Sequence, residues 1–314
     1  MQRDKKENGA RMMYDLAIVG AGPAGLSAAL DAAYLKLKAV VLEAGEPGGA
    51  LSQVYPWKKV DSFLGLRGMT GREIADRIIG HAKAEGAEIR EKERVLEVRK
   101  LKAFEIATDR GKLEASAVVL ATGIRGLPRK LGVAGEGLEG VLYSLQDPGK
   151  LSGKCVVVVG GGDTAADCAL GLRAAGADVT LVHRRGELRA RDAARRGLEK
   201  SGVRMLLNAE VDRIVGKGRV EGVMLRRGGG TSEVGCGNVL VCAGSVPQEE
   251  WLRGMGIAMD GILVKAGPDC ATSVPGIFAA GDLVSRIKRI PQALATGEAA
   301  AYSAYKLLKD PYWK

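Results

Sequence analysis

The sequence contains few aromatic residues and no long apolar run. Phe, Trp and Tyr make up 4% of its 314 residues. No basic stripe is interleaved with aromatics, which argues against nucleic-acid binding despite a formal net charge of +10. No apolar run reaches the ~18 residues that a membrane-spanning helix needs, and the polar N-terminus, MQRDKKENGARMM, lacks the apolar core of a secretory signal. We therefore expect a cytoplasmic protein that binds neither membrane nor nucleic acid.

Closely spaced cysteine pairs are also missing. The chain has no C-x-x-C pair and no cysteine spacing typical of metal ligands. Its five cysteines are Cys155, Cys168, Cys236, Cys242 and Cys270. We expect all five to be reduced thiols in the core, where free cysteine behaves as a small hydrophobic residue, and we expect no metal site.

Glycine, in contrast, is abundant. The 45 glycines are about twice the usual share of ~7%, and they gather where strands lead into helices, as in nucleotide-binding loops. The rest of the composition, 46% apolar and 27% charged, is that of an ordinary globular protein. The length allows one large domain or two medium ones, each with its own core.

One β–α–β pattern occurs twice in the chain. An apolar strand at residues 14–19, a glycine-rich turn, a helix to about residue 35 and a strand at 38–43 form the first unit. Strands at 155–159 and 178–183 flank a second turn and helix about 140 residues later. The predicted fold is therefore α/β, with two Rossmann-like domains. We place the second domain at residues 123–244, inserted into a first domain made of residues 1–122 and 245–314.

The first turn has the sequence pattern of a dinucleotide site. Gly20, Gly22 and Gly25 form G-x-G-x-x-G between a strand and a helix, with Pro23 and Ala24 inside the motif. Gly20 permits the tight turn, Gly22 lets the pyrophosphate approach the backbone, and Gly25 lets the helix pack closely. Glu43, 23 residues after Gly20, ends the second strand and suits hydrogen bonds from ribose hydroxyls.

The second turn differs from the first at the position of the acid. Gly160, Gly162 and Ala165 form the G-x-G-x-x-A variant, with Asp163 and Thr164 inside it. Counting 23 residues from Gly160 gives His183 instead of an acid, and three cations follow, Arg184, Arg185 and Arg189. Guanidinium groups bind a 2′-phosphate that a carboxylate would repel. The second domain is thus predicted to prefer NADP over NAD, unless the basic run is only a solvated helical face.

Nearly the whole chain resembles the thioredoxin-reductase-like branch of the two-dinucleotide-binding flavoproteins. The shared features are both glycine motifs, the cation cluster, Ala121-Thr122-Gly123, and the segment from Gly276 to Asp282. The resemblance implies FAD in the first domain, NADPH in the second, and a homodimer. It also implies that Gly281 and Asp282 contact the ribityl chain, and that Gln292 and Ala293 begin a helix beside the pyrimidine end of the flavin.

The expected redox cysteines of a thioredoxin reductase are absent. Ser144 and Asp147 stand where that C-x-x-C would be, and neither can form a disulfide. The chain is more similar to the ferredoxin or flavodoxin–NADP reductases on the same scaffold. That group implies FAD contacts at Gly49 and Leu51, and a flavin-stacking role for Tyr55, although a simple turn residue before Pro56 is the alternative. Ala50 departs from the glutamine usual in this group, which leaves the electron acceptor open.

The resulting hypothesis is an FAD-dependent oxidoreductase that takes hydride from NADPH and passes electrons to ferredoxin or flavodoxin. No acid or base is needed for hydride transfer, so we nominate no catalytic side chain. A basic chain suits such an acidic partner. Two alternatives remain: an NAD(P)H-dependent disulfide reductase or oxidase with an unusual cysteine relay, and a non-catalytic flavoprotein subunit of a larger electron-transfer complex.

Overall fold

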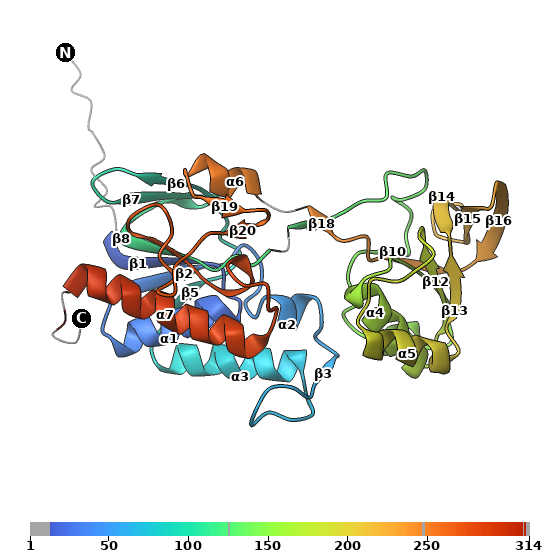
Figure 1. Cartoon of the computed structure of the whole chain (residues 1–314), viewed down its shortest axis with the longest axis horizontal. Coiled ribbons are helices and arrows are strands. Elements are labelled where there is room, and N and C mark those ends of the chain that lie inside the picture. Colours follow the sequence, from blue (N-terminus) through green and yellow to red (C-terminus); the bar gives the residue numbers. More distant parts are fainter. Residues whose placement is uncertain (1–12, 125, 247–248, 310, 312–314) are drawn as a thin grey trace, which may run out of the picture. The chain divides into compact units, whose positions relative to one another are not determined.

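The computed structural model describes residues 13–124, 126–246, 249–309 and 311. The chain divides into two compact units (Figure 1). Unit 1 comprises residues 1–52, 60–124 and 248–314, and unit 2 comprises residues 53–59 and 125–247. The long insertion expected from the sequence is therefore accompanied by a short segment, 53–59, that the sequence did not assign to it.

Unit 1 is built on a parallel sheet extended by antiparallel strands. Its elements are β1 (Met13–Val19), α1 (Pro23–Tyr34), β2 (Ala39–Leu42), α2 (Ala50–Gln53), β3 (Lys59–Val60), β4 (Met69–Thr70), α3 (Gly71–Ala84), β5 (Glu88–Arg90), β6 (Val95–Lys100), β7 (Phe104–Thr108), β8 (Gly111–Leu120), α6 (Glu249–Gly254), β19 (Met259–Asp260), β20 (Leu263–Val264), β21 (Ile277–Ala279), the 3-10 helix η2 (Gly281–Leu283) and α7 (Ile290–Lys309). The last residue of α2 and the first of β3 belong to segment 53–59 of unit 2.

The strands of unit 1 lie in the order β5-β2-β1-β8-β7-β6, and β21 also pairs with β8. Strands β5, β2, β1, β8 and β21 run parallel, whereas β6 and β7 add antiparallel pairs. Side chains of β1 alternate between two cores. Leu16 and Ile18 pack in the core that includes residues of α1, α3 and α7, while Ala17 and Val19 pack in the other.

Helices α1 and α7 pack unusually closely. A Cβ atom at Gly297 of α7 would lie 2.1 Å from the carbonyl oxygen of Ala24 in α1. Only glycine permits this approach, and it brings the start of α7 beside the start of α1. The β–α–β unit with a parallel strand pair that the sequence predicts for residues 14–43 is confirmed.

Unit 2 repeats the parallel arrangement with its own small antiparallel sheet. Its elements are β9 (Leu127–Pro128), β10 (Val141–Leu142), the 3-10 helix η1 (Pro148–Leu151), β11 (Cys155–Val159), α4 (Asp163–Ala174), β12 (Asp178–His183), α5 (Asp192–Ser201), β13 (Arg204–Leu207), β14 (Ala209–Val215), β15 (Gly222–Arg227), β16 (Gly230–Gly235), β17 (Asn238–Val241) and β18 (Ser245–Val246).

The parallel sheet of unit 2 has the order β10-β17-β11-β12-β13, and β14, β15 and β16 form a separate meander. Val156 and Val158 of β11 face the core under α4 and α5, whereas Val157 and Val159 face the core under the meander. A run of β-branched residues therefore forms a strand that is covered on both faces. Together, the two sheets confirm the predicted α/β fold with two Rossmann-like domains.

Candidate functional site

The first glycine loop has the geometry that its motif requires. Gly20 has φ +102°, and a Cβ atom there would lie 2.6 Å from the carbonyl oxygen of Ala121. A Cβ at Gly25 would lie 1.8 Å from the carbonyl oxygen of Gly20. At Gly22, in contrast, the nearest atom to such a Cβ would be 3.8 Å away, at Gly49. A side chain at Gly20 or Gly25 would therefore collide with the backbone, whereas the space at Gly22 is open. An open middle glycine lets a pyrophosphate approach the loop.

The N-terminus of α1 has the features of an anion-binding site. Gly22 is the N-cap and provides no side-chain hydrogen bond, Pro23 begins the helix, and no acid lies in the first turn. The amide groups of the first turn are therefore not capped by the residue before them, and the helix dipole favours a negative group there. Ala24 is buried at the interface with α7, so it fixes the loop by packing.

Glu43 is held by the backbone of the loops around it. Its Oε2 accepts a hydrogen bond from the Ala21 amide at 2.8 Å, and its Oε1 accepts one from Gly45, also at 2.8 Å. Each carboxylate oxygen has a second lone pair. The carboxylate is thus fixed in place beside the glycine loop and can still accept hydrogen bonds from ribose hydroxyl groups.

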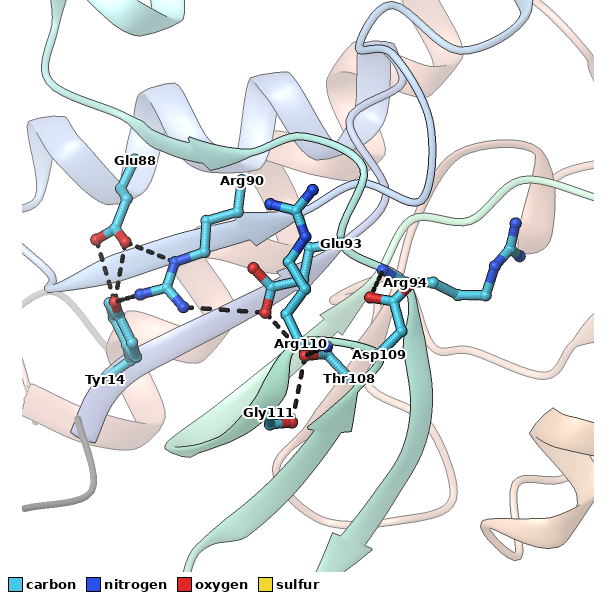
Figure 2. A network of polar contacts seen from close by, with 9 residues as sticks. All are labelled: Tyr14, Glu88, Arg90, Glu93, Arg94, Thr108, Asp109, Arg110 and Gly111. Atoms are coloured by element: carbon cyan, nitrogen blue, oxygen red, sulfur yellow. Dashed lines mark hydrogen bonds and ion pairs between the residues drawn. The ribbon is translucent and has the colours of Figure 1, made fainter. Parts of the chain in front are cut away.

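A polar network connects strands β1, β5 and β7 (Figure 2). Arg90 Nη2 donates to the Tyr14 hydroxyl at 2.6 Å, and Arg90 Nε donates to Glu88 at 2.9 Å. Glu93 is only 5% exposed and accepts from the Thr108 hydroxyl at 2.9 Å. Burial, followed by the hydrogen bond to Glu88, raises the pKa of Tyr14. The network joins β1, β5 and the β7–β8 hairpin, and so fixes β5 against the end of β2.

A second pair of glycines reaches the first loop from the segment before α2. The Gly48 amide donates to the Ala21 carbonyl at 2.8 Å. Gly49 has φ +56°, and a Cβ there would lie 2.9 Å from Cα of Gly22. Gly49 therefore lies at the open part of the loop. Leu51 is buried against Ile74 and Ala75, so its side chain contributes packing.

Two further predicted segments end at the same edge of the sheet. Strand β8 lies between β1 and β21, and Leu120 is in register with both Val19 and Ala279. The carboxyl ends of parallel strands meet at one edge. Ala121, Thr122 and Gly123 follow β8 there, and Gly281 and Asp282 follow β21 after one residue.

The segment around Asp282 is fixed by α7. The Gly281 amide donates to Oγ1 of Thr296 at 2.8 Å, and a Cβ at Gly281 would lie 2.9 Å from Cβ of Ala24. Lys288 Nζ donates to the Asp282 carbonyl at 2.6 Å, and burial lowers the pKa of this lysine. Gln292 is partly exposed in the first turn of α7, and Ala293 is buried. The structure thus brings together the FAD residues expected in unit 1.

Tyr55 is not part of unit 1. It belongs to segment 53–59, which the contacts assign to unit 2, and its hydroxyl lies 2.9 Å from Oγ1 of Thr164. Its stacking on a flavin stays a prediction.

The second glycine loop follows the same plan as the first. A Cβ at Gly160 would lie 2.5 Å from the carbonyl oxygen of Cys242, and no atom lies within 4 Å of one at Gly162. Ala165 takes the place of the third glycine and is fully buried. Burial favours a higher pKa for Asp163, but hydrogen bonds from the backbone and guanidinium of Arg191 outweigh it and lower that pKa.

His183 lies directly against this loop. A Cβ at Gly161 would lie 2.3 Å from Cε1 of its ring, so glycine makes room for the imidazole. Burial, then the charges of Arg184 and Arg189, lower the pKa of His183 despite an opposing hydrogen bond to the backbone of Glu187. Its Nε2 is the buried side-chain nitrogen or oxygen without a hydrogen-bond partner in the described part of the chain.

The cation cluster continues from His183. Arg184, Arg185 and Arg189 are exposed, and the Arg189 amide donates to the Gly161 carbonyl at 2.7 Å. In residues 126–246 none of the three forms an ion pair with a carboxylate. Their guanidinium groups are therefore available to a phosphate beside the loop.

The sequence did not indicate Arg191 as a site residue. Its Nε lies 3.0 Å from Asp163, and Nη2 lies 3.6 Å from Asp167 of α4. The signal that could have found it is its position two residues after Arg189, in the same basic run.

Two structural observations limit other classes of site. In the described ranges, no group of three or more His, Cys, Asp or Glu side chains could hold a metal ion. None of the helices in those ranges combines sufficient length with sufficient apolar character to traverse a bilayer.

Comparison with known proteins agrees with this geometry. Residues 14–297 match the pyridine nucleotide-disulphide oxidoreductase family. A ferredoxin–NADP reductase of Ignicoccus hospitalis is 36% identical over 306 residues, covering 96% of this chain and 100% of the relative. A thioredoxin reductase of Listeria monocytogenes is 33% identical, covering 95% of each chain. The crystal structure of T. acidophilum thioredoxin reductase is 31% identical with a TM-score of 0.84, covering 94% of this chain and 98% of that one.

These relatives confirm the resemblance and the expected cofactors. The family consists of flavoproteins that use FAD and NADPH, and the two glycine loops described above fit two dinucleotides. The relatives have two kinds of names, so the comparisons establish an oxidoreductase and leave the acceptor open. The chain belongs to the pyridine nucleotide-disulphide oxidoreductase family and has a thioredoxin-reductase-like scaffold.

Proposed function

We propose that this protein is an NADPH-dependent flavoprotein reductase that delivers electrons to a ferredoxin- or flavodoxin-like carrier. The observation that carries the proposal is the pair of matched glycine loops with opposite charge: a carboxylate held beside one loop and a cation cluster beside the other.

We assign FAD to unit 1. The amides at the start of α1, with Gly22 and Gly49, would hold the pyrophosphate, and Glu43 would accept hydrogen bonds from the ribose. Asp282 and the start of α7 would hold the ribityl chain and the pyrimidine end. When bound, FAD supplies the chemistry of accepting two electrons as a hydride and releasing them singly.

We assign NADPH to unit 2. The start of α4 would bind the pyrophosphate, with Gly162 open above the loop, and Arg184, Arg185 and Arg189 would bind the 2′-phosphate. His183 would act by packing its ring against Gly161 of the loop. These residues bind and orient the coenzyme, and hydride transfer itself requires no side-chain acid or base.

The electron acceptor is inferred from Ser144 and Asp147, which stand where a thioredoxin reductase would have its redox cysteines. Asp147 accepts a hydrogen bond from the Gly149 amide at 2.8 Å and is the N-cap of η1. This position thus has a structural role and no redox chemistry. The Ignicoccus hospitalis relative, named for ferredoxin, supports the same acceptor, and the net charge of +10 favours an acidic partner. The homodimer and the cytoplasmic location remain part of this proposal.

The expectation that all five cysteines lie in the core is wrong for two of them, because Cys155 is exposed and Cys242 is partly exposed. The three buried cysteines offer little support for a disulfide relay. Burial raises the pKa values of both Cys236 and Cys270 to about 11. The neighbouring Cys242, through a hydrogen bond, and then burial raise the pKa of Cys168. Thiols with raised pKa values are poor nucleophiles at neutral pH. An unusual relay would use a close pair of cysteines such as Cys168 and Cys242.

Anaerobic mixing tests the proposal. The purified yellow protein is reduced with NADPH and then mixed with ferredoxin, flavodoxin or thioredoxin while the flavin absorbance is followed. We expect rapid reoxidation by ferredoxin or flavodoxin and none by thioredoxin. The variant Cys168→Ser with Cys242→Ser should react at the unchanged rate.

Reoxidation by thioredoxin that disappears in the double cysteine variant would contradict the proposal in favour of a relay. Failure of the isolated chain to reduce any carrier after normal reduction by NADPH would instead indicate a subunit of a larger complex.

A further inference from the structure

Two loops of unit 1 hold large apolar side chains in solvent. Residues 61–68 connect β3 to β4, and Leu64 in this loop is 97% exposed. Residues 285–289 lie between η2 and α7, and Ile287 among them is 62% exposed. Exposed apolar side chains of this size mark an interaction site when they lie together. We call these two ranges the two-loop surface.

The two loops lie side by side. Arg289 Nη2 donates to the Ser62 carbonyl at 3.3 Å. Phe63 and Leu66 of the first loop pack against a small buried cluster of α2 and α3, and Ile290, which follows the second loop, packs against the same cluster. The two exposed side chains therefore extend from adjoining parts of one surface.

The exposure of Leu64 is built into the first loop. The Leu66 amide donates to the Phe63 carbonyl at 3.1 Å, which closes a four-residue turn. Gly65 has φ +86°, which suits the third position of a type II turn. Phe63 and Leu66 are partly buried, so the turn is anchored on both sides of Leu64 while Leu64 itself stays in water.

Hydrogen bonds fix the second loop in a similar way. The Ile287 amide donates to Oγ of Ser285 at 3.0 Å, and the Arg289 amide donates to the Ile287 carbonyl at 3.1 Å. Lys288 Nζ donates to the Asp282 and Ser285 carbonyls. A serine hydroxyl that bonds to the backbone two residues on stabilises a turn. Backbone contacts on both sides therefore hold Ile287 at the surface.

Cations surround the two apolar side chains. The two-loop surface carries four cations, Arg67, Arg286, Lys288 and Arg289, and one acid, Asp61. All five are exposed. Arg286 is paired with Asp260 at 2.9 Å, whereas Arg67 and Arg289 form no ion pair with a carboxylate in the described part of unit 1. An apolar centre with a cationic rim suits an acidic protein partner.

The two-loop surface adjoins the proposed flavin site. Its second loop lies between Asp282 and the start of α7, both of which we assign to FAD. Lys288 donates to the Asp282 carbonyl at 2.6 Å. The Arg289 carbonyl accepts a hydrogen bond at 3.0 Å from the amide of Ala293, in the first turn of α7. A protein that docks on these loops would therefore lie beside the proposed flavin site.

A second copy of this chain does not suit the two-loop surface. In a two-fold symmetric dimer centred on it, the cations of one copy would face the cations of the other, and like charges across an interface suppress such pairing. We propose that the two-loop surface is the docking site for an acidic electron carrier of the ferredoxin type. The carrier would bury Leu64 and Ile287 and place its carboxylates beside Arg67 and Arg289. This inference rests on the proposed function.

Leu64→Ser with Ile287→Ser tests the apolar centre. The assay is NADPH-dependent reduction of a purified acidic ferredoxin by the holoprotein. We expect the KM for ferredoxin to rise roughly tenfold, because two apolar side chains no longer leave water on docking. FAD content and the rate of flavin reduction by NADPH should stay unchanged, since both side chains already lie in solvent in the free protein.

Leu96→Ser with Leu101→Ser is the matched control for the apolar pair. Leu96 and Leu101 are 53% and 64% exposed, on the edge strand β6 and directly after it. The control removes the same kind of side chain from the same unit, and it should leave the KM for ferredoxin unchanged.

Arg67→Glu with Arg289→Glu tests the cationic rim. The KM for ferredoxin should rise roughly tenfold at low salt and by less at high salt, because exposed charges are screened there. Arg94→Glu with Arg110→Glu is the matched control, with the same charge change at exposed positions of unit 1. It should raise the KM by no more than about twofold, through the lower net charge alone.

Three outcomes would overturn the inference. The first is an unchanged ferredoxin KM in either two-loop variant, or an equal rise in its control, while the wild-type protein reduces ferredoxin. The second is a dimer that sedimentation shows to dissociate in Leu64→Ser/Ile287→Ser, since a second copy would then cover the surface. The third is a wild-type protein that is reduced by NADPH but does not reduce ferredoxin, and only this outcome would also overturn the proposed function.

Discussion

Reversing the charge beside the second glycine loop should change which coenzyme is used. We expect Arg184→Glu with Arg185→Ala to raise the KM for NADPH and to leave the KM for NADH within a factor of about three, since NADH has no 2′-phosphate. Both side chains are exposed, so each lost contact to the phosphate is worth about 1 kcal/mol, well below a buried ionic hydrogen bond.

The magnitude follows from three contributions. Two lost contacts cost about 2 kcal/mol, and the new carboxylate near a phosphate adds about 1 kcal/mol of repulsion. A total of about 3 kcal/mol corresponds to roughly a 100-fold increase in KM, at about 1.4 kcal/mol for each factor of ten. The increase should shrink at high salt, because exposed charges are screened there.

The assay is steady-state reduction of an artificial acceptor with each coenzyme at low and high salt. Arg226→Glu with Arg227→Ala is the matched control, because it makes the same charge change at exposed positions of β15 in the same unit. An unchanged ratio of the two KM values in Arg184→Glu/Arg185→Ala would refute the assignment of the cation cluster to the 2′-phosphate.

Two further predictions concern unit 1. Gly25→Ala should abolish FAD loading, because its Cβ would lie 1.8 Å from the Gly20 carbonyl oxygen. Gly80→Ala is the control and should bind a full complement of FAD, because a Cβ there would have no atom within 4 Å. Released flavin is measured by absorbance, and full FAD loading of Gly25→Ala would contradict the loop geometry. Burial and then the charge of Glu298 raise the pKa of Asp31 to about 6, above its unfolded value, so the free energy of unfolding should fall as pH rises from about 4 to 6. Asp31→Asn should remove that fall and add about 1 kcal/mol to the free energy of unfolding at pH 8, after discounting for partial exposure. The measurement is denaturant unfolding of both proteins across this pH range, and the same pH dependence in both would rule the prediction out.

The fold was largely predictable because its signals are local. A run such as Val156–Val159 has one interpretation as a buried strand, and glycines at 20, 25 and 160 are imposed by carbonyl oxygens that any β–α–β turn places there. The strands expected at 155–159 and 178–183 are those observed for β11 and β12. The inserted second domain followed from the repetition of the same unit.

The missed features depend on contacts between distant parts of the chain. Segment 53–59 contacts α4 through Trp57 and Gly171, which are more than 100 residues apart in the sequence. No local sequence pattern shows that a glycine accommodates a distant indole ring. The buried Glu93 looks like a loop residue until Arg90 and Thr108 are placed around it (Figure 2). Arg191 was hidden in a basic run for the same reason.

The most direct test of two unlike nucleotide sites is a count of what the protein binds. Flavin released from the purified protein should amount to one FAD per chain, and calorimetric titration of that same holoprotein should give one NADP+ per chain. Protein that emerges colourless and takes up no FAD on reconstitution would contradict the account, and so would NADP+ that binds only when FAD has been removed.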